Sequence, residues 1–511
     1  MKNKLFTVLL ALIICQAGIS QQYKTITYPR KDVKPEDVFN QKTLEKSINY
    51  IFSWQQAAGA FGDLTTFSTW GDDGVIGRRY HGQFTSHSSR ILQIMLSMYD
   101  ETGDKIWKRR AEDIVSNMMY LQAKSGGFIQ ASAENGPSYS EETTCVIHQN
   151  LIIQGLLKYA GKEYANPDLK DEIHKVIDKH WIWFIKKFNQ RGTPGGRKVE
   201  GWPWRCFDGV TNQDLNAIHA LALYGKVYGD MSRYEEFGKP VLDVLLSDRY
   251  YYKGLGLFER GDNTSWKRPE TTHYYYYVFG ELKAIYEITN DQRIPEVLED
   301  VCKQLFRATY VGEDGLRYFA YLANIIKENN TVKVIGYDKY PIDMGDHFAL
   351  MKALDWYLEQ HPDSEKQKIR DEIYQTAAAY VFANGTISRN LNPKKDILAL
   401  TPDLYRLPMF LLSKLKGKIH TFEVDDTPAI QRKYKDFIWY EKGQFYWVDK
   451  AEKRVFAGFK SESRSIVIGT DEKLPAVEFE KAKTYSENEE VIIEVLDFRY
   501  SNNTKIDIEK K

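Results

Sequence analysis

Histidine, tyrosine and arginine, which transfer protons and bind anions, are concentrated in residues 265–277, SWKRPETTHYYYY. The Pro-Glu-Thr-Thr segment after Arg268 has the residue types of a helix start, and His273 and four tyrosines follow it. At about 100° per residue, His273 and Tyr277 share one helix face and Tyr274 points to a neighbouring face. Buried phenols need hydrogen-bond partners, so helix packing explains only part of this cluster and leaves at least one phenol for a cavity.

A second candidate cluster lies in residues 207–225, FDGVTNQDLNAIHALALYG. Asn212, Asn216 and His219 are spaced i, i+4 and i+7, so they form one polar stripe on an otherwise apolar helix. A lone histidine on such a helix is more often a buried core residue than a catalyst. Three polar groups in one stripe make a functional site and a core position equally good interpretations.

Three loop-rich segments add basic, aromatic and acidic side chains to the candidate site. We expect these residues to bind substrate: His87, Arg90, Tyr139, Glu142, Trp202 and Arg205. Basic residues beside tryptophans suit an anionic sugar, because the sugar ring stacks on indole and its carboxylate meets guanidinium. The alternative for any single residue is a solvated loop position or a core tryptophan.

These residue types suit the β-elimination of a uronate-containing polysaccharide. The reaction removes the C5 proton, and the enzyme must neutralise the adjacent carboxylate and stabilise the charge that develops. It also needs a base for C5 and an acid for the departing O4, roles that histidine and tyrosine fill when a cation lies nearby. The residue types that could supply the neutralising group, the base and the acid are all present among five residues: Asn212, His219, Arg268, His273 and Tyr274.

The elements that must position these residues are helices. Between about residues 35 and 416, helical patterns alternate with loops rich in Gly, Pro, Asp and Asn. One set of helices is apolar nearly all round after a polar start, and the helices between them are amphipathic, as expected for an inner and an outer layer. We expect twelve helices, at residues 36–58, 86–100, 104–123, 141–160, 167–189, 212–228, 231–246, 271–289, 292–308, 343–360, 364–383 and 402–416.

A histidine recurs in the first turns of five proposed inner helices, every 54 to 74 residues. The five positions are His87, His148, His219, His273 and His347. One helical hairpin per repeat of this size predicts an (α/α) toroid of six or seven hairpins, with the polar helix starts gathered at one rim. An open solenoid is the alternative, but it offers the polar helix starts no shared cavity.

β-Structure is expected in two places. Residues 318–340 alternate between apolar and polar side chains around an Asn-Asn pair at 329–330, which predicts a hairpin inserted between helical repeats. Towards the C-terminus the sequence becomes strand-like with short polar turns. We therefore assign residues 21–419 to an (α/α)-barrel domain and residues 420–511 to a small β-rich appendage that packs against it.

The N-terminus has the pattern of a secretory signal peptide in residues 1–20. Lys2 and Lys4 precede an apolar run at residues 5–15, which is too short to span a membrane, and small residues precede the expected cleavage site. Cys15 follows bulky apolar residues rather than the small ones of a lipoprotein signal. We expect a protein exported to the periplasm or the cell exterior, without stable membrane insertion.

Composition excludes other classes of function. The 511 residues include 70 Lys and Arg and 70 Asp and Glu, and a formal charge of zero argues against a nucleic-acid partner, although it allows a local basic cleft. Three of the four cysteines, Cys145, Cys206 and Cys302, follow the signal, and their spacing fits neither disulfides nor zinc, so buried thiols are expected. No calcium-loop spacing occurs in the sequence, and we expect no metal or cofactor.

The chain resembles the (α/α)-barrel polysaccharide lyases that degrade alginate and glucuronan, in particular the family with a seven-hairpin barrel. The resemblance covers about residues 35–416 and rests on the exported helical-repeat architecture, the Asn/His stripe, and Arg268 six residues before Tyr274. It implies that Tyr274 is the catalytic acid and a candidate base, with His219 as its partner or as the base on the other face. It also implies that Arg268 holds the substrate carboxylate or the tyrosine. Other barrel lyases have an Asn-His dipeptide at the neutralising position, whereas a glutamine follows Asn212 here, so the neutralising residue is left open.

Two other functions fit the same composition, and both keep a carbohydrate as the partner. A glycoside hydrolase on the same toroid needs two carboxylates flanking the scissile bond. The available acids are Glu142, Asp214, Asp343, Asp346 and Asp403, and their spacing singles out no pair. A non-catalytic glycan-binding protein would keep the aromatic residues but would not need Tyr274 or His219. An anionic polysaccharide or oligosaccharide is the expected partner.

Overall fold

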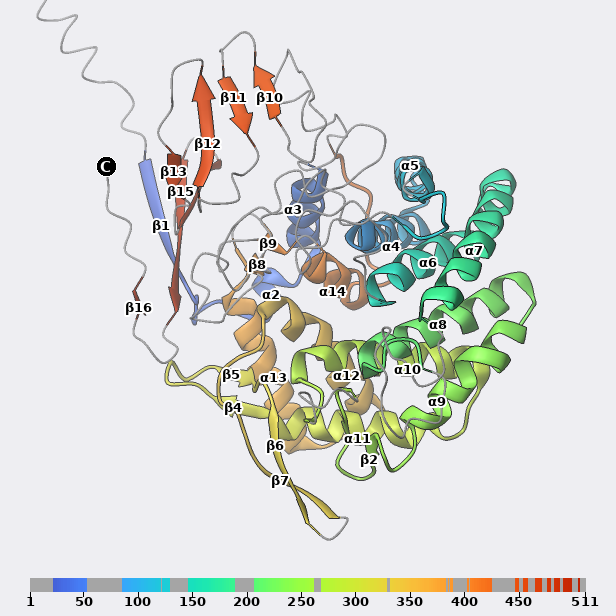
Figure 1. Ribbon diagram of the computed structural model, residues 1–511. Coiled ribbons are helices and arrows are strands. Elements are labelled where there is room, and N and C mark those ends of the chain that lie inside the picture. Colours follow the sequence, from blue (N-terminus) through green and yellow to red (C-terminus); the bar gives the residue numbers. More distant parts are fainter. Residues whose placement is uncertain are drawn as a thin grey trace, which may run out of the picture.

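The computed structural model describes most of the helical region and the strands that follow it (Figure 1). The described residues are 22–52, 85–120, 122–128, 146–188, 206–261, 268–328, 331–382, 385, 387–388, 402–403 and 405–424, together with the strands between residues 446 and 505. The expected signal peptide lies outside them. No helix in this part of the chain is long and apolar enough to cross a membrane.

Six helices of the described residues form a closed inner ring (Figure 1). They are α4 (Thr85–Thr102), α6 (Val146–Ala160), α8 (Thr211–Tyr228), α10 (Tyr275–Thr289), α12 (Met344–Gln360) and α14 (Arg406–Lys414). Each packs against the next, and α14 packs against α4. The predicted (α/α) toroid is therefore confirmed, and the described residues supply six inner helices rather than the seven of the barrel that the chain resembles.

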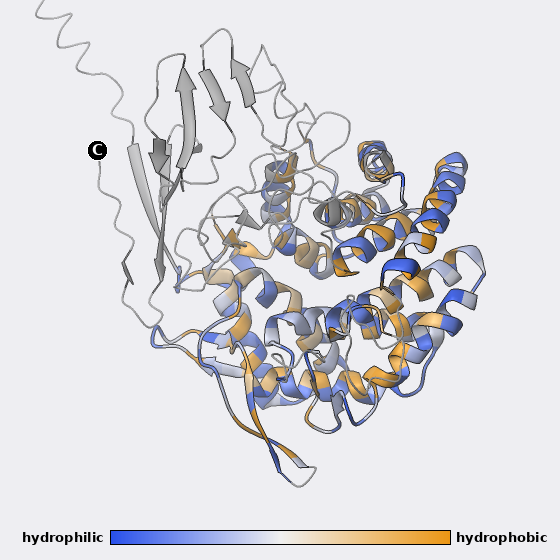
Figure 2. Ribbon diagram, viewed as in Figure 1, coloured by the Kyte–Doolittle hydropathy of each residue, from blue (hydrophilic) through white to orange (hydrophobic). Residues whose placement is uncertain are grey.

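A second layer of helices covers the ring. It consists of α5 (Lys105–Tyr120), α7 (Pro167–Phe188), α9 (Lys239–Leu245) with the π-helical turn η4 (Tyr234–Gly238), α11 (Ile294–Arg307), α13 (Ser364–Ala379) and α3 (Gln41–Phe52). In α11, Ile294, Val297, Leu298, Val301 and Leu305 are buried along one stripe. Figure 2 shows the same alternation of hydrophobic and hydrophilic residues along the other helices. Because α3 packs on α14, the first and last barrel helices complete one hairpin.

Local signals in the sequence set several helix ends. Asp363 caps α13 by accepting hydrogen bonds from the backbone N–H groups of Glu365 and Lys366, each at 3.0 Å. Gly229 ends α8 and Asn290 ends α10, both in the left-handed conformation that terminates helices, with φ of 78° and 54°. These ends leave only short connections between an inner helix and the outer helix after it.

The two ends of the barrel differ in the length of their connections. Residues 103–104, 290–293 and 361–363 join an inner helix to the following outer helix. Residues 189–210, 246–271, 308–343 and 380–405 instead lead from an outer helix to the start of an inner one. Every inner helix therefore begins at the same end, here called the long-loop end, which is where a scaffold of this kind gathers its functional residues.

Short hairpins lie in the long connections at the long-loop end. They are β2 (Tyr251–Tyr252) with β3 (Leu257–Phe258), β4 (Thr309–Val311) with β5 (Arg317–Phe319), and β6 (Ala323–Glu328) with β7 (Thr331–Tyr337). The predicted inserted hairpin is confirmed: Glu328 pairs with Thr331, on either side of the Asn-Asn pair, which lies outside the described residues. Figure 1 shows β6 and β7 projecting away from the helices.

The predicted C-terminal strands are also present. The described strands are β10 (Tyr446–Asp449), β11 (Arg454–Ala457), β12 (Ser465–Thr470), β13 (Ala476–Glu478), β14 (Ala482–Glu487), β15 (Glu490–Phe498) and β16 (Thr504–Lys505). The first four form an antiparallel meander, and β14 and β16 pair with β15. An N-terminal strand, β1 (Gln22–Tyr28), runs parallel to β15 with Gln22 opposite Glu490. No pattern in the sequence predicts this pairing.

Two predicted helices contain a non-helical break or a strand in the structure. The helix expected at residues 36–58 breaks into α2 (Pro35–Val38) and α3, because Phe39 leaves the helical conformation and packs its ring against Phe348, Tyr374 and Phe410. The helix expected at 402–416 begins only at Arg406. Pro402–Asp403 forms strand β9 and pairs with β8 (Ile387–Ser388). Proline fits the start of a strand as well as the start of a helix, so residue type alone did not separate the two.

Candidate active site

A buried hydrogen-bonded pair, His219 of α8 and Glu281 of α10, lies between two inner helices. His219 Nδ1 bonds the Oε2 atom of Glu281, and each residue is 5% exposed. The same carboxylate accepts hydrogen bonds from Asn216 Nδ2 at 2.9 Å and from Gln154 Nε2, on α6, at 3.0 Å. Three adjacent inner helices thus hold one carboxylate in a fixed position.

Glu281 directs the proton of the His219 ring. Burial on its own raises the pKa of the Glu281 carboxyl, but the charge and hydrogen bond of His219, with further help from Arg90 and Asn216, bring the pKa below its ordinary value. An ionised Glu281 fixes the ring hydrogen on Nδ1. When the ring is neutral, this places the lone pair on Nε2, which has no hydrogen-bond partner among the described residues and can accept a proton.

Arginines meet tyrosines across the interior of the ring. The Arg90 guanidinium of α4 lies 5.6 Å from the ring centre of Tyr277, and the Arg406 guanidinium of α14 lies 3.9 Å from that of Tyr276. The two tyrosine rings are 4.0 Å apart on α10. Because α10 stands opposite α4 in the ring, the contact between Arg90 and Tyr277 bridges the interior. Arg406 also donates a 3.1 Å hydrogen bond to Asp346 of α12.

Two lysines add positive charge to the same interior. Lys158 of α6 donates to Gln93 at 2.7 Å, and Lys352 of α12 donates to the Met409 carbonyl oxygen at 3.1 Å. Burial, followed by the charges of neighbouring arginines, lowers the pKa of each lysine to about 8. Near neutral pH both are still mostly protonated. The described interior therefore holds two arginines and two lysines against the carboxylates Glu281 and Asp346, an imbalance that suits an anionic ligand.

Tyr274 lies beside an arginine that the sequence analysis did not single out. It ends the 3-10 turn η6 (Thr272–Tyr274), is partly exposed, and has the Arg260 guanidinium 4.6 Å from its ring centre. Glu270 fixes Arg260 through an ion pair of 2.6 Å. Burial lowers the pKa of Arg260, but the negative charge of Glu270 and the Tyr274 phenol outweigh it and keep the guanidinium charged. This fixed cation stabilises negative charge on the phenol oxygen.

The other described residues of the predicted site lie near these groups. Asn212 is buried in the first turn of α8, and its Oδ1 has no partner among the described residues. Tyr277 packs against Ile147 and Leu151 of α6, and Tyr274 contacts the same cluster. The ring centres of His273 and Tyr274 are 3.8 Å apart, and the ring planes are tilted by 46°.

Arg268 is partly exposed, and its carbonyl oxygen accepts a hydrogen bond from the Arg260 N–H. The structure thus places Arg260, rather than Arg268, over the Tyr274 ring. His219 has Glu281, rather than Tyr274, as its hydrogen-bond partner. The roles of His219, Tyr274 and Arg268 in a reaction stay predictions.

Several predicted residues cannot be placed relative to these groups. Tyr139, Glu142, Trp202 and Arg205 lie outside the described residues, as does the side chain of His87, whose backbone is part of α4. Cys206 and Cys302 are buried thiols, as predicted.

Two of the acids considered for a hydrolase, Asp214 and Asp346, are committed to other partners, and Asp343 is the partly exposed residue before α12. Asp214 accepts backbone hydrogen bonds from Asp208 at 2.7 Å and Gly209 at 3.2 Å, so it holds the loop before α8. Burial raises the pKa of its carboxyl to about 8. Asp346 binds Arg406, and the side chains of Glu142 and Asp403 lie outside the described residues.

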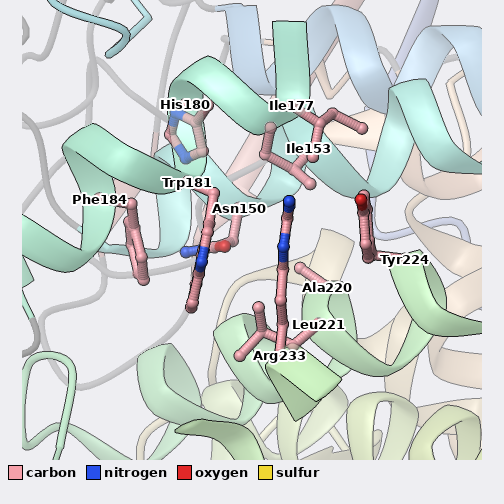
Figure 3. Close-up of a pocket in the computed structure, with 10 residues that line it drawn as sticks. All are labelled: Asn150, Ile153, Ile177, His180, Trp181, Phe184, Ala220, Leu221, Tyr224 and Arg233. Atoms are coloured by element: carbon pink, nitrogen blue, oxygen red, sulfur yellow. The ribbon is translucent and has the colours of Figure 1, made fainter. Parts of the chain in front are cut away.

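A pocket between α6, α7 and α8 is separate from the site (Figure 3). Its volume is about 20 Å³, which is room for about one water molecule and not for a sugar ring. Figure 3 shows Arg233 extending between Trp181 and Tyr224, and mostly apolar side chains complete the wall. This pocket is a packing defect between the layers.

Comparison with known proteins shows the fold. No protein-family model matches the sequence, and no curated protein matches it. A sugar epimerase from a ruminal bacterium is similar in structure, with a TM-score of 0.52 and 11% identity over 75% of this chain and 98% of that chain. An unsaturated glucuronyl hydrolase specific for heparin has a TM-score of 0.47 and 12% identity over 75% of this chain and 97% of that chain. A polysaccharide lyase has a TM-score of 0.41 and 10% identity over 64% of this chain and 88% of that chain. The shared feature is the (α/α) toroid.

Proposed function

We propose that the protein is a polysaccharide lyase that cleaves a uronate-containing polysaccharide, with alginate and glucuronan as first candidates, by β-elimination. The observation that carries this proposal is the pairing of His219 with the buried Glu281 in an interior of excess positive charge. A directed histidine base removes a carbon-bound proton, and the cations stabilise the carboxylate beside that carbon as charge develops.

The residues divide the reaction as follows. His219 Nε2 takes the C5 proton, the C5–H electron pair forms the C4=C5 double bond, and the C4–O4 bond breaks. Tyr274 gives its proton to the departing O4, while Arg260 stabilises the phenolate that results. Arg90 and Asn212 lie on the inner helices, where the guanidinium neutralises the substrate carboxylate and the amide N–H donates a hydrogen bond to it.

The state of the carboxylates favours a lyase over a hydrolase. A hydrolase needs one protonated acid and one accessible carboxylate on either side of the bond. Glu281 accepts three hydrogen bonds, and Asp346 is engaged by Arg406. The base and the acid of an elimination are instead supplied in this proposal by His219 Nε2 and by the Tyr274 phenol, which lies beside Arg260.

Incubation with polymannuronate, polyguluronate, glucuronan and pectate tests the proposal. A lyase produces the ultraviolet absorbance of the new C4=C5 double bond together with new chain ends. Reducing ends that form without this absorbance would indicate the hydrolase, and binding without either signal would indicate a glycan-binding protein. Export to the periplasm or cell exterior, predicted from residues 1–20, belongs to the proposal because such polymers are found there.

A further inference from the structure

A row of stacked rings runs along two of the long connections. Tyr340 and Tyr321, from residues 308–343, stack with ring centres 4.7 Å apart and planes 20° apart. Tyr321 stacks on His273 at 5.7 Å and 29°, and His273 contacts Tyr274 at 3.8 Å. The row therefore links the inserted segment around β6 and β7 to the start of α10.

Backbone hydrogen bonds hold the row in place. The Thr272 N–H donates to the Tyr321 carbonyl oxygen at 2.9 Å, which ties the two connections together. The Asp338 carbonyl oxygen accepts from the N–H groups of Tyr321 at 3.1 Å and Tyr340 at 2.9 Å. The Asp338 side chain accepts a further hydrogen bond from Asn324 at 2.9 Å. These hydrogen bonds therefore hold the rings in a preorganised arrangement.

One end of the row meets the candidate active site and the other end meets solvent. Tyr274 contacts the cluster of Ile147, Leu151 and Tyr277, and Tyr277 faces Arg90. Tyr340 is 37% exposed and is the one aromatic among the large exposed apolar side chains of the described residues. Tyr321 covers one face of its ring. A stacked tyrosine at the surface fills no core, whereas its outer face offers the surface on which a pyranose ring packs.

Arg268 acts electrostatically on the exposed ring. Burial, with the charges of Tyr321 and Asp338, raises the pKa of Tyr340 to about 12, and the Arg268 guanidinium acts in the opposite direction. Arg268 is itself partly exposed. An aromatic face beside a guanidinium matches a sugar that carries a carboxylate.

We propose that Tyr340, Tyr321 and Arg268 form a subsite for a uronate unit several sugars away from the cleaved bond. The sugar ring stacks on Tyr340, Arg268 binds its carboxylate, and the row of rings guides the polymer towards Tyr274. This inference rests on the proposed function for the identity of the polymer. It changes the role that the family resemblance implies for Arg268, from the reacting sugar to a remote one.

The test compares Tyr340→Ala with Ile335→Ala in the full-length chain. Ile335 is 64% exposed on β7 of the same inserted segment, so its replacement controls for any disturbance of the hairpin. Loss of the stacking face should raise KM for the polyuronate that is cleaved by roughly two- to tenfold, with kcat unchanged. KM for a trisaccharide too short to reach the subsite should stay at the wild-type value, and Tyr340→Phe should restore KM for the polymer.

Equal KM changes for polymer and trisaccharide, or an equal effect of Ile335→Ala, would overturn the subsite. Binding of polymannuronate and glucuronan, measured by affinity electrophoresis, separates this result from failure of the proposed reaction. If no double bond forms with any polymer but Tyr340→Ala still weakens binding, the subsite stands and the lyase is rejected. If Arg268→Gln weakens binding of polyuronates and of an uncharged glucan equally, the carboxylate contact is refuted.

Discussion

In the proposed mechanism, Glu281 turns the buried His219 into a directed base. Replacing it by glutamine keeps the shape and removes the charge, so the His219 tautomer is no longer fixed. We expect Glu281→Gln to lower kcat by at least about 10²-fold with a folded protein by circular dichroism. Asp300→Asn is the control, because it alters a buried carboxylate on the outer helix α11 that bonds Tyr251 and Gly254. A rate for Glu281→Gln within a few-fold of wild type would contradict the assignment.

The Tyr274 phenol is the proposed acid for the leaving oxygen. Tyr274→Phe keeps the ring and its contacts with His273 and Arg260 but removes the transferable proton. Turnover should fall by at least about 10²-fold while polymer binding is retained. Tyr310→Phe should leave the rate unchanged, because the Tyr310 hydroxyl has no hydrogen-bond partner among the described residues. Normal turnover in Tyr274→Phe would require another acid.

The interior lysines predict a pH dependence of substrate binding. Lys158 and Lys352, each with a pKa lowered to about 8, are charged below that pH and lose their charge as the pH rises through it. Attraction for a polyuronate should therefore weaken on the alkaline side, and KM should rise between about pH 7.5 and 9. Initial rates across this range at several substrate concentrations measure the effect, and Lys352→Met should flatten it. A KM that is constant to pH 9 would show that the lysines do not contact the substrate.

The sequence predicted several side chains of the candidate site, but it did not predict the residues that they contact. Asn216 and His219 were recognised because their spacing places them on one helix face. Glu281 was missed although it follows Tyr277 by four residues and shares its face, since an isolated acid on an apolar helix has no pattern. Arg260 was missed because its contact with Tyr274 depends on the path of a long connection.

At the scale of elements, the inner helices α4 and α6 come into close contact at Gly155. A Cβ there would lie 2.7 Å from Ser89 Cβ, so Gly155→Ala should lower the free energy of unfolding by about 1–3 kcal/mol. Gly280 is exposed on α10, and a Cβ at this position would have no atom within 4 Å. Gly280→Ala should therefore raise the free energy of unfolding by about 0.5–1 kcal/mol. Urea unfolding of the two variants and of the wild type measures both changes in the free energy of unfolding. Stabilisation by Gly155→Ala would contradict the close helix contact.

Helices and hairpins were predictable because their signals are local. The periods of apolar residues located the barrel helices, and turn residues located the hairpin of β6 and β7. Phe39 and Pro402 were the exceptions, since ring packing in one case and strand pairing in the other outweighed the local pattern. The pairing of β1 with β15 joins residues 22–28 to residues 490–496, a separation over which the sequence carries no register signal.

At the scale of the whole molecule, a closed ring explains why a chain of zero net charge carries a basic site. Ring closure through α14 and α4 brings Arg406 and Arg90 into one interior with Lys158 and Lys352. The recurring histidines predicted the toroid, because closure places the starts of all inner helices at one end. The charge imbalance could not be predicted, since it depends on which side chains of each helix turn inward.

The most direct measurement is the fate of solvent oxygen in the products. Purified full-length protein would be incubated with the polyuronate that it degrades in water enriched in heavy oxygen, and the oligosaccharides analysed by mass spectrometry. β-Elimination predicts unsaturated products that are lighter than saturated oligosaccharides by one water and carry no heavy oxygen from bond cleavage, and their formation should be lost in His219→Ala. Saturated products with one heavy oxygen per cleaved bond would show hydrolysis and contradict the proposed lyase.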